Sequence, residues 1–265
     1  MILEENVFDK MGKYWAEIAD QNSTDCQLEF IKNTLKSEGL VLDLACGTGR
    51  HLISLSKEGY SMVGLDVSSN LLRIAKNRSG DVQLIKADMR FLPFAPKAFS
   101  SAVSMDTSFG YLPSEKDDLQ SLSEVKEALM DGGSLIVDVF NSEHLISKNK
   151  TSWLRQLKWA LVPIMVRAAR MPFHFFKWKE YPSFFLLQKR SVEAKGAHLH
   201  DLWVVCDKED QHIRVFEHNA RLYGVKQLQM LLENASFIVK AVYGDYDKQN
   251  FNSSSNRLIF VAKSE

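Results

Sequence analysis

The segment Val41–His51, VLDLACGTGRH, determines the fold expected for this chain of 265 residues. An apolar run reaches the acidic residue Asp43 and then enters a turn of small residues that opens a helix at about Arg50. Glycine lets the backbone approach a ligand where any Cβ would collide, and Gly47 and Gly49 fit that role. The segment therefore predicts a strand, a ligand-binding loop and a helix, as in open α/β sheets that bind nucleotide-like ligands.

The alternation of apolar runs and helical patterns continues to about residue 141. Short, nearly continuous apolar strands separated by amphipathic helices imply a parallel sheet covered on both faces, because parallel strands need crossover connections. The tail holds two strand patterns, FIVKAVYGDYD and RLIFVAKS, with no helical pattern between them, as an antiparallel hairpin requires. The prediction is an α/β fold with a doubly wound, mostly parallel seven-stranded sheet and an antiparallel C-terminal hairpin, plus an inserted helical and antiparallel β substrate cap.

Four regions are expected along the chain. Residues 4–38 predict two helices, the second with Leu28, Ile31 and Leu35 on one face and Gly39 as its C-cap. These helices are expected to close over the carboxyl edge of the sheet. The regions are an N-terminal helical lid at 1–39, a cofactor-binding core at 40–141, an inserted cap and substrate region at 142–221, and the completion of the core sheet at 222–265.

Composition narrows the class of protein. The chain has 45% hydrophobic residues, and its 33 Lys and Arg balance its 33 Asp and Glu, so the overall charge does not indicate a polyanionic partner. Cys26, Cys46 and Cys206 are widely spaced and fit neither a disulfide framework nor a zinc site, so no metal is expected. The acidic start lacks the pattern of a signal peptide, and no apolar stretch reaches the length of a membrane span. We expect a cytoplasmic protein.

The charges of the loop discriminate between cofactors. Ala45 stands where the dinucleotide pattern GxGxxG has its first glycine, and Arg50 stands where it has its third, so a pyrophosphate cradle is disfavoured. A cofactor with a cationic sulfonium gains little from a helix N-terminus, whereas an acidic residue such as Asp43 helps to neutralise it. The loop therefore favours a sulfonium cofactor.

The next strand ends at Asp66, 19 residues after Gly47, where a carboxylate can accept hydrogen bonds from both hydroxyls of a ribose. At the end of the third strand, Asp88 is placed for an adenine amino group and Met89 for stacking on the ring. The fourth strand brings Met105 and Asp106 to the same edge of the sheet. Each strand-end aspartate can also serve as a helix N-cap, but their recurrence at one edge favours a ligand.

Five segments in order resemble the class I S-adenosylmethionine-dependent methyltransferase family, of the small-molecule type: LDLACGTG, GLDVSSNLL, ADMRFLPF, SMDTSFGYL and LMDGGSLIVDVF. The resemblance covers about residues 35–141, and more weakly the tail after Leu222. It implies S-adenosyl-L-methionine as the cofactor. The residues expected at the cofactor are Tyr14, Asp43, Ala45, Cys46, Gly47, Gly49, Asp66, Val67, Asp88, Met89, Met105 and Asp106.

Several residues have two interpretations. Cys46 lies at a helix N-terminus, which lowers a thiol pKa, but its place in the loop favours a small packing role. Tyr14 is interpreted as a lid over the cofactor, with core packing as the alternative. The sequence assigns no catalytic residue, and the candidates for a general base are His144, His198 and His200.

Residues 151–190 hold three of the five tryptophans, five of the sixteen phenylalanines, eight Lys or Arg and a single acidic residue. Two helical pieces are expected, TSWLRQLKWALV and PIMVRAARM. The segment is interpreted as a cap over the substrate, with peripheral membrane contact and nucleic-acid binding as alternatives. Nucleic acid ranks last because DTSF stands where base methyltransferases carry an Asn/Asp-Pro-Pro-aromatic segment.

The expected reaction is direct methyl transfer to an oxygen or nitrogen, or to a carbon, of a small molecule, with apolar molecules among the candidates. The alternatives left open are a noncatalytic cofactor-binding regulatory module, a methyltransferase for a membrane lipid, a quinone or RNA, and another chemistry such as aminopropyl transfer. The sequence does not indicate the oligomeric state.

Overall fold

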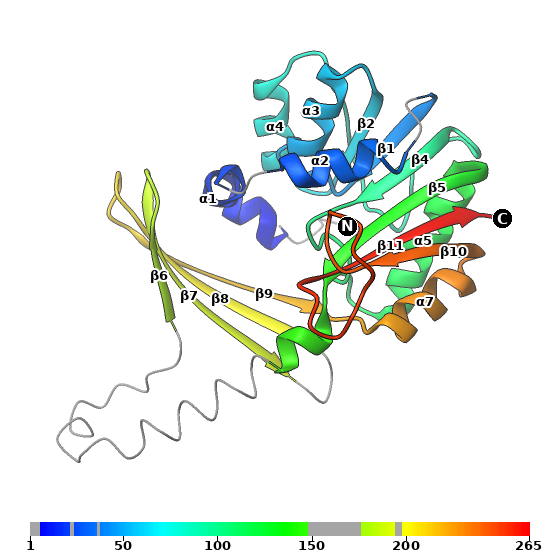
Figure 1. Ribbon diagram of the computed structural model, residues 1–265. Coiled ribbons are helices and arrows are strands. Elements are labelled where there is room, and N and C mark those ends of the chain that lie inside the picture. The colour runs from blue at the N-terminus through cyan, green and yellow to red at the C-terminus, as the bar shows by residue number, and fades with distance from the viewer. Residues whose placement is uncertain (1–5, 22–23, 36–37, 148–175, 194–197) are drawn as a thin grey trace. The chain divides into compact units, whose positions relative to one another are not determined.

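The computed structural model describes residues 6–21, 24–35, 38–147, 176–193 and 198–265. The chain divides into two compact units, one made of Met1–Asn141 with Tyr223–Glu265 and the other of Ser142–Leu222. Each unit is built around its own sheet (Figure 1).

The first unit contains a seven-stranded sheet in the order β10-β11-β5-β4-β1-β2-β3. Strands β1 to β5 pair in parallel, whereas β11 is antiparallel to both of its neighbours, β5 and β10. No helix separates β10 from β11, so the chain returns as a hairpin. The strands are β1 (Leu40–Leu44), β2 (Ser61–Asp66), β3 (Gln83–Lys86), β4 (Phe99–Ser104), β5 (Leu129–Phe140), β10 (Phe237–Tyr243) and β11 (Arg257–Ser264).

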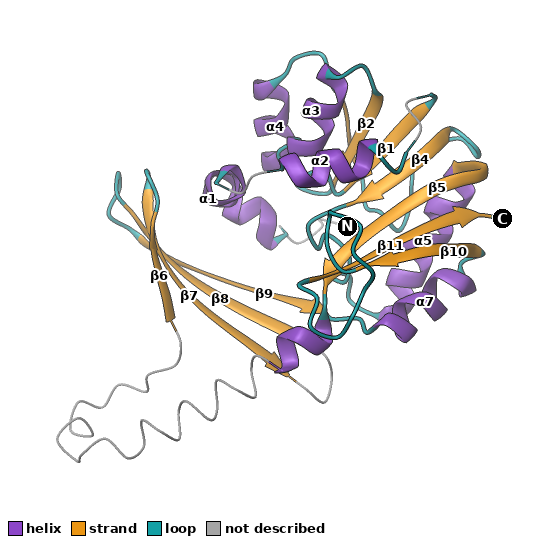
Figure 2. Ribbon diagram, viewed as in Figure 1, coloured by secondary structure: helices purple, strands orange, loops and turns teal. Residues whose placement is uncertain are grey.

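Helices cover both faces of this sheet, because its strands are apolar on both sides (Figure 2). In β1, Leu42 and Leu44 pack in the core that α5 and α7 cover, whereas Val41 packs on the other face with α2 and α3. The helices are α1 (Val7–Asp20), α2 (Asp25–Lys32), α3 (Arg50–Lys57), α4 (Ser69–Arg78), α5 (Glu115–Ala128) and α7 (Val225–Asn234). The predicted fold class, a mostly parallel sheet with an antiparallel C-terminal hairpin, is confirmed.

The end of α2 corrects one prediction. Leu28, Ile31 and Leu35 are buried as expected, but the helix ends at Lys32 instead of continuing to Gly39. The hydroxyl of Thr34 donates to the carbonyl oxygen of Phe30 at 2.6 Å, which is the local side-chain bonding that competes with helix continuation. In the described parts of the chain, no helix is long and apolar enough to cross a membrane.

The second unit contains an antiparallel sheet in the order β6-β7-β8-β9. Its members are β6 (Phe176–Glu180), β7 (Phe184–Glu193), β8 (His198–Asp207) and β9 (Ile213–Arg221). This sheet is the antiparallel β part that was expected in the inserted region at 142–221, and its first strand, β6, lies within the basic aromatic segment. The two helical pieces expected at residues 151–171 lie outside the described residues.

Candidate active site

A cavity of about 290 Å³ opens in the first unit where the parallel strands end. Its wall is formed mostly by residues at and after the ends of β1, β2, β3 and β4, together with residues of α1 and Leu71 of α4. The carboxyl edge of an open α/β sheet is where ligands of such folds bind. Of the residues expected at the cofactor, those that line this cavity are Ala45, Gly47, Asp66, Val67, Asp88, Met89 and Asp106.

Asp66 joins the end of β2 to the loop after β1. Its two carboxylate oxygens accept one backbone N–H each, from Gly47 at 2.8 Å and from Ser68 at 2.8 Å. Gly47 has a φ of 54°, which glycine adopts without strain. Burial raises the pKa of Asp66, while the backbone hydrogen bonds from Ser68 and Gly47 oppose that rise. Because a carboxylate oxygen has two acceptor positions, each oxygen can also accept a ligand hydroxyl.

Ala45 lies in the left-handed region, with a φ of 58°. In the sequence, Ala45 stands where the dinucleotide pattern has its first glycine, and a residue there has to be small. The structure shows a second requirement, a positive φ, which costs an L-amino acid about 1–2 kcal/mol. Alanine is therefore small enough for this position, but its Cβ makes the positive φ energetically costly.

Asp43 lies in β1 and is only 2% exposed, and it is not part of the cavity lining. Burial raises its pKa to about 7, and a backbone hydrogen bond from Leu52 partly offsets this effect. Leu52 is in the first turn of α3, whose N-cap, Gly49, offers no side-chain hydrogen bond. Asp43 thus caps α3 from the neighbouring strand. Its Oδ2 atom is buried and has no hydrogen-bond partner within the described parts of the chain.

Cys46 and Gly49 are both buried and serve packing. A Cβ added at Gly64 in β2 would stand 2.8 Å from the Cys46 sulfur, so the thiol fills the space above that glycine. Burial raises the pKa of the Cys46 thiol well above its usual range, which disfavours a nucleophile. A Cβ at Gly49 would meet Ile53 at 3.1 Å and Ala75 at 3.2 Å, so this glycine allows α3 and α4 to approach each other.

Asp88 and Met89 line the cavity after β3, and Arg90 beside them was not identified from the sequence. The Arg90 guanidinium contacts both carboxylate oxygens of Asp88, at 2.6–3.1 Å, and reaches Asp117 of α5 at 3.1 Å. This hydrogen bonding lowers the pKa of Asp88 and holds the carboxylate ionised. The sequence shows only that Arg90 follows Asp88 by two residues. This spacing does not indicate the contact between Arg90 and Asp117 of α5.

Helix α1 and the loop after β4 contribute aromatic rings to the cavity wall. Phe8 makes edge contacts with Trp15 and with Tyr111, at centroid distances of 5.2 Å and 5.0 Å, and all three residues line the cavity. Tyr14, which was expected over the cofactor, is 2% exposed and lies in the packed interior outside this lining. Asp9 fixes α1 to α4 by accepting from the Ser68 hydroxyl at 2.6 Å and from the backbone N–H of Asn70 at 2.8 Å.

Arg50 and Asp106 connect the loop after β1 with the turn after β4. The Arg50 guanidinium lies 2.8 Å from the Asp106 carboxylate, and the Asp106 side chain is 36% exposed on the cavity wall. Met105, also expected at the cofactor, is buried and not part of the lining.

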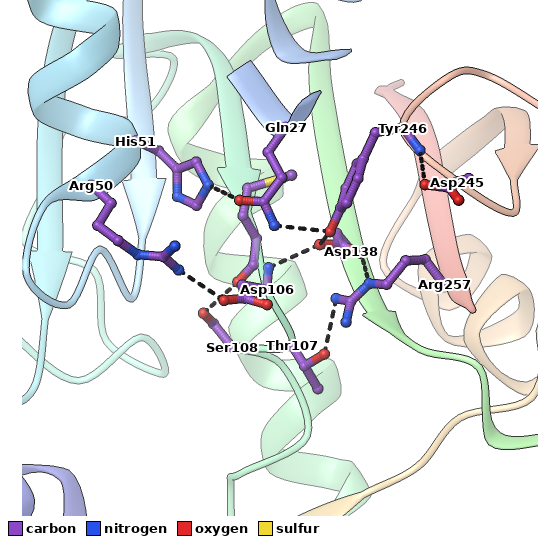
Figure 3. A network of polar contacts seen from close by, with 11 residues as sticks. Gln27, Arg50, His51, Asp106, Thr107, Ser108, Asp138, Asp245, Tyr246 and Arg257 are labelled. Carbon is purple, nitrogen blue, oxygen red and sulfur yellow. Dashed lines mark hydrogen bonds and ion pairs between the residues drawn. The ribbon is translucent and has the colours of Figure 1, made fainter. Parts of the chain in front are cut away.

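A polar network adjoins the turn after β4 (Figure 3). His51 contacts the Gln27 carbonyl oxygen at 2.7 Å, and the Gln27 amide donates to the Tyr246 hydroxyl at 3.0 Å. Burial lowers the pKa of His51 to about 4, so the ring is neutral and donates through Nε2–H. The Tyr246 hydroxyl donates in turn to Asp138 at 2.7 Å. The sequence reading identified none of these four residues, because they come from α2, α3, β5 and the loop before β11.

The three histidines proposed as weak base candidates belong to the second unit. On β8, His198 and His200 share a face, as predicted, and His200 contacts the Asn219 side chain of β9 at 2.7 Å. His144 lies in the helical residues 142–147. None of the three belongs to the lining of the cavity described above.

Comparison with known proteins places this geometry in a family. Residues 41–133 match the family described as methyltransferase domain. The Bacillus subtilis protein YqeM, a methyltransferase by name, is 23% identical over 97% of each chain. A dTDP-3-amino-3,4,6-trideoxy-α-D-glucopyranose N,N-dimethyltransferase of Streptomyces venezuelae is 34% identical over 42% of this chain and 46% of its own.

Among solved structures, an S-adenosylmethionine-dependent methyltransferase of Clostridium acetobutylicum superposes with a TM-score of 0.74 at 18% identity, over 98% of this chain and 99% of its own. That likeness concerns the fold and includes both sheets. Residues 41–133 are therefore a methyltransferase domain, and the chain has the class I S-adenosylmethionine-dependent methyltransferase fold, with a cavity at the strand ends.

Proposed function

We propose that this enzyme methylates the neutral amine nitrogen of a small molecule, with the cofactor held in the cavity at the ends of β1 to β4. When bound, S-adenosylmethionine supplies a methyl group that its sulfonium activates for attack. The contribution of the chain is then to bind, to align and to exclude water.

The described residues fit this cofactor. Asp66 keeps acceptor positions for ribose hydroxyls, and Asp88 and Met89 lie on the wall where an adenine ring is expected. The loop from Ala45 to Gly49, whose residues Ala45 and Gly47 line the cavity, is proposed to surround the methionine part of the cofactor. The buried Oδ2 of Asp43, without a hydrogen-bond partner in the described chain, favours a positive charge nearby, as the cofactor's sulfonium and ammonium would provide.

The proposal of an amine acceptor rests on the hydrogen bonds and ion pairs that the carboxylates of the lining already make. Asp66 receives two backbone N–H groups, Asp88 is held by Arg90, and Asp106 is paired with Arg50. No histidine or cysteine occurs among the described lining residues. A hydroxyl acceptor usually needs a general base, whereas a neutral amine needs only its lone pair. Because the carboxylates of the described lining are already hydrogen-bonded or ion-paired, the cavity favours an amine as the methyl acceptor.

The aromatic cluster of Phe8, Trp15 and Tyr111 suits the same reaction. Three rings in edge contact give the wall a continuous apolar surface, which excludes water from the reacting atoms. The Streptomyces venezuelae relative named as an amino-sugar N,N-dimethyltransferase supports a nitrogen acceptor, but its similarity covers less than half of this chain.

Paired substrates test this proposal. Formation of S-adenosylhomocysteine is measured with small amines and with the alcohols of the same carbon skeletons. We expect turnover of amines, with a rate that rises with pH in step with deprotonation of each amine. Turnover of the alcohols in preference to the amines would contradict the proposal, as would cofactor binding without turnover of any acceptor in a broad panel.

A further inference from the structure

The turn after β4 has an unusual backbone. Asp106 and Thr107 have φ values of 55° and 62°, so two consecutive residues other than glycine lie in the left-handed region. For Thr107, a β-branched residue, this conformation is an outlier. Such strained residues persist only where the surrounding structure fixes them, and they cluster at functional sites. Both residues line the cavity.

Asp138 of β5 holds the backbone of this turn. Its Oδ2 atom accepts the backbone N–H of Asp106 at 2.9 Å, and its carbonyl oxygen accepts the backbone N–H of Thr107 at 2.9 Å. Asp138 is fully buried, so the carboxylate needs compensating donors.

Arg257 of β11 and Tyr246 supply those donors (Figure 3). The Arg257 Nε–H donates to Asp138 Oδ1 at 2.7 Å, and a second guanidinium nitrogen donates to the Thr107 hydroxyl at 3.0 Å. The Tyr246 hydroxyl donates to Asp138 Oδ2 at 2.7 Å. One guanidinium thus contacts both the carboxylate that holds the turn and the side chain of the turn itself.

We propose that Asp138 and Arg257 are positioning residues for cofactor binding: they hold the Asp106–Thr107 turn in its strained conformation, so that the Asp106–Arg50 pair stays fixed on the cavity wall. The alternative is that Asp138 and Arg257 only join β5 to β11 and do not affect cofactor binding. The inference rests on the proposed function in one respect, that the cofactor occupies this cavity.

The experiment is calorimetric titration of the full chain with S-adenosylhomocysteine, combined with thermal unfolding of each variant. Arg257→Met keeps a long apolar side chain but removes every donor, and it is expected to weaken binding about tenfold or more because the turn relaxes. The control is Lys263→Met, since Lys263 also joins β11 to β5, through a 2.6 Å hydrogen bond to Ser134, but does not contact the turn. The control is expected to bind as the wild type does.

A rescue separates positioning from general stability. Glycine adopts a positive φ without steric cost, so Thr107→Gly in the Arg257→Met background should recover most of the lost affinity. A purely structural pair predicts no recovery, because the second substitution removes a further buried side chain. If Arg257→Met does not fold, Tyr246→Phe removes one donor to Asp138 and keeps the ring against Phe30; a loss of a few-fold is then expected.

The outcomes are distinguishable. If the wild type binds S-adenosylhomocysteine and Asp66→Ala does not, the proposed cofactor site is supported. Wild-type affinity in Arg257→Met would then overturn only the positioning role. Tyr246→Phe takes the place of Arg257→Met in this comparison if Arg257→Met does not fold. Equal losses in Arg257→Met and Lys263→Met, or failure of Thr107→Gly to recover binding, would also overturn it. A wild-type chain that does not bind would overturn the proposed function, and the positioning role with it.

Discussion

The backbone N–H of Gly47 donates to the carboxylate of Asp66 over 2.8 Å, so the loop after β1 and the end of β2 form one bonded unit. The carboxylate proposed to receive the ribose hydroxyls also fixes the loop proposed to surround the methionine part of the cofactor. On this proposal, substitution of Asp66 removes a ligand contact and loosens the loop at the same time.

Ala45→Gly is expected to stabilise the protein by about 0.5–1 kcal/mol. Glycine removes the steric cost of a φ of 58°. Part of this gain is lost because glycine also has more conformational freedom in the unfolded chain. Urea denaturation measures the difference. The matched control is Ala19→Gly in the helix α1, which should destabilise by about 1 kcal/mol. Equal destabilisation by both substitutions would show that the left-handed backbone at Ala45 carries no strain.

Asp43 should make the stability of the ligand-free protein depend on pH. Burial raises its pKa to about 7 in the folded state, from 3.8 in the unfolded chain, so the folded state binds more protons between these values. This contribution to the free energy of unfolding is fully present below the unfolded pKa and is lost as the pH rises through about 7.

Urea denaturation of the wild type and of Asp43→Asn at about pH 5.5 and about pH 8 measures this loss, which should be on the order of 1–2 kcal/mol in the wild type relative to the variant. Asp43→Asn mimics the neutral carboxyl group and isolates the loss, because His51, whose pKa burial lowers to about 4, changes the stability of both proteins with pH in the opposite direction. A variant with the same pH dependence as the wild type would exclude Asp43 as its source.

Cys46 should resist alkylation in the folded protein. Burial raises the pKa of its thiol, and the side chain packs on Gly64, whereas Cys26 is exposed on α2. Iodoacetamide followed by mass spectrometry should therefore modify Cys26 rapidly and Cys46 only after denaturation. Cys26→Ser provides the control, since it should abolish the rapid modification. Modification of Cys46 at the rate of Cys26 would reopen the interpretation of Cys46 as a reactive thiol.

The sequence predicted the part of the site that follows from the parallel sheet. Asp66, Asp88, Met89 and Asp106 each follow a short apolar strand, and the carboxyl ends of parallel strands meet at one edge. The order of the strands then brings residues that are far apart in the chain onto one wall without any knowledge of side-chain packing.

The residues that the sequence did not indicate depend on register and on long-range packing. Arg257 reaches Thr107 only because β11 pairs antiparallel with β5 and places Arg257 opposite Phe140. For a similar reason Tyr14 was expected over the cofactor, although it is buried and its neighbour Trp15 lines the cavity. A helical pattern shows that two neighbouring residues face different directions, but not which of them faces the cavity.

Calorimetric titration of the wild type and of Asp66→Ala with S-adenosylhomocysteine, with NAD as the control ligand, tests the central claim most directly. We expect micromolar binding of S-adenosylhomocysteine but not of NAD by the wild type, and a loss of at least about tenfold in the variant, whose cooperative thermal unfolding is retained. Unchanged affinity in Asp66→Ala would contradict the account, because the cofactor would then bind somewhere other than at the end of β2.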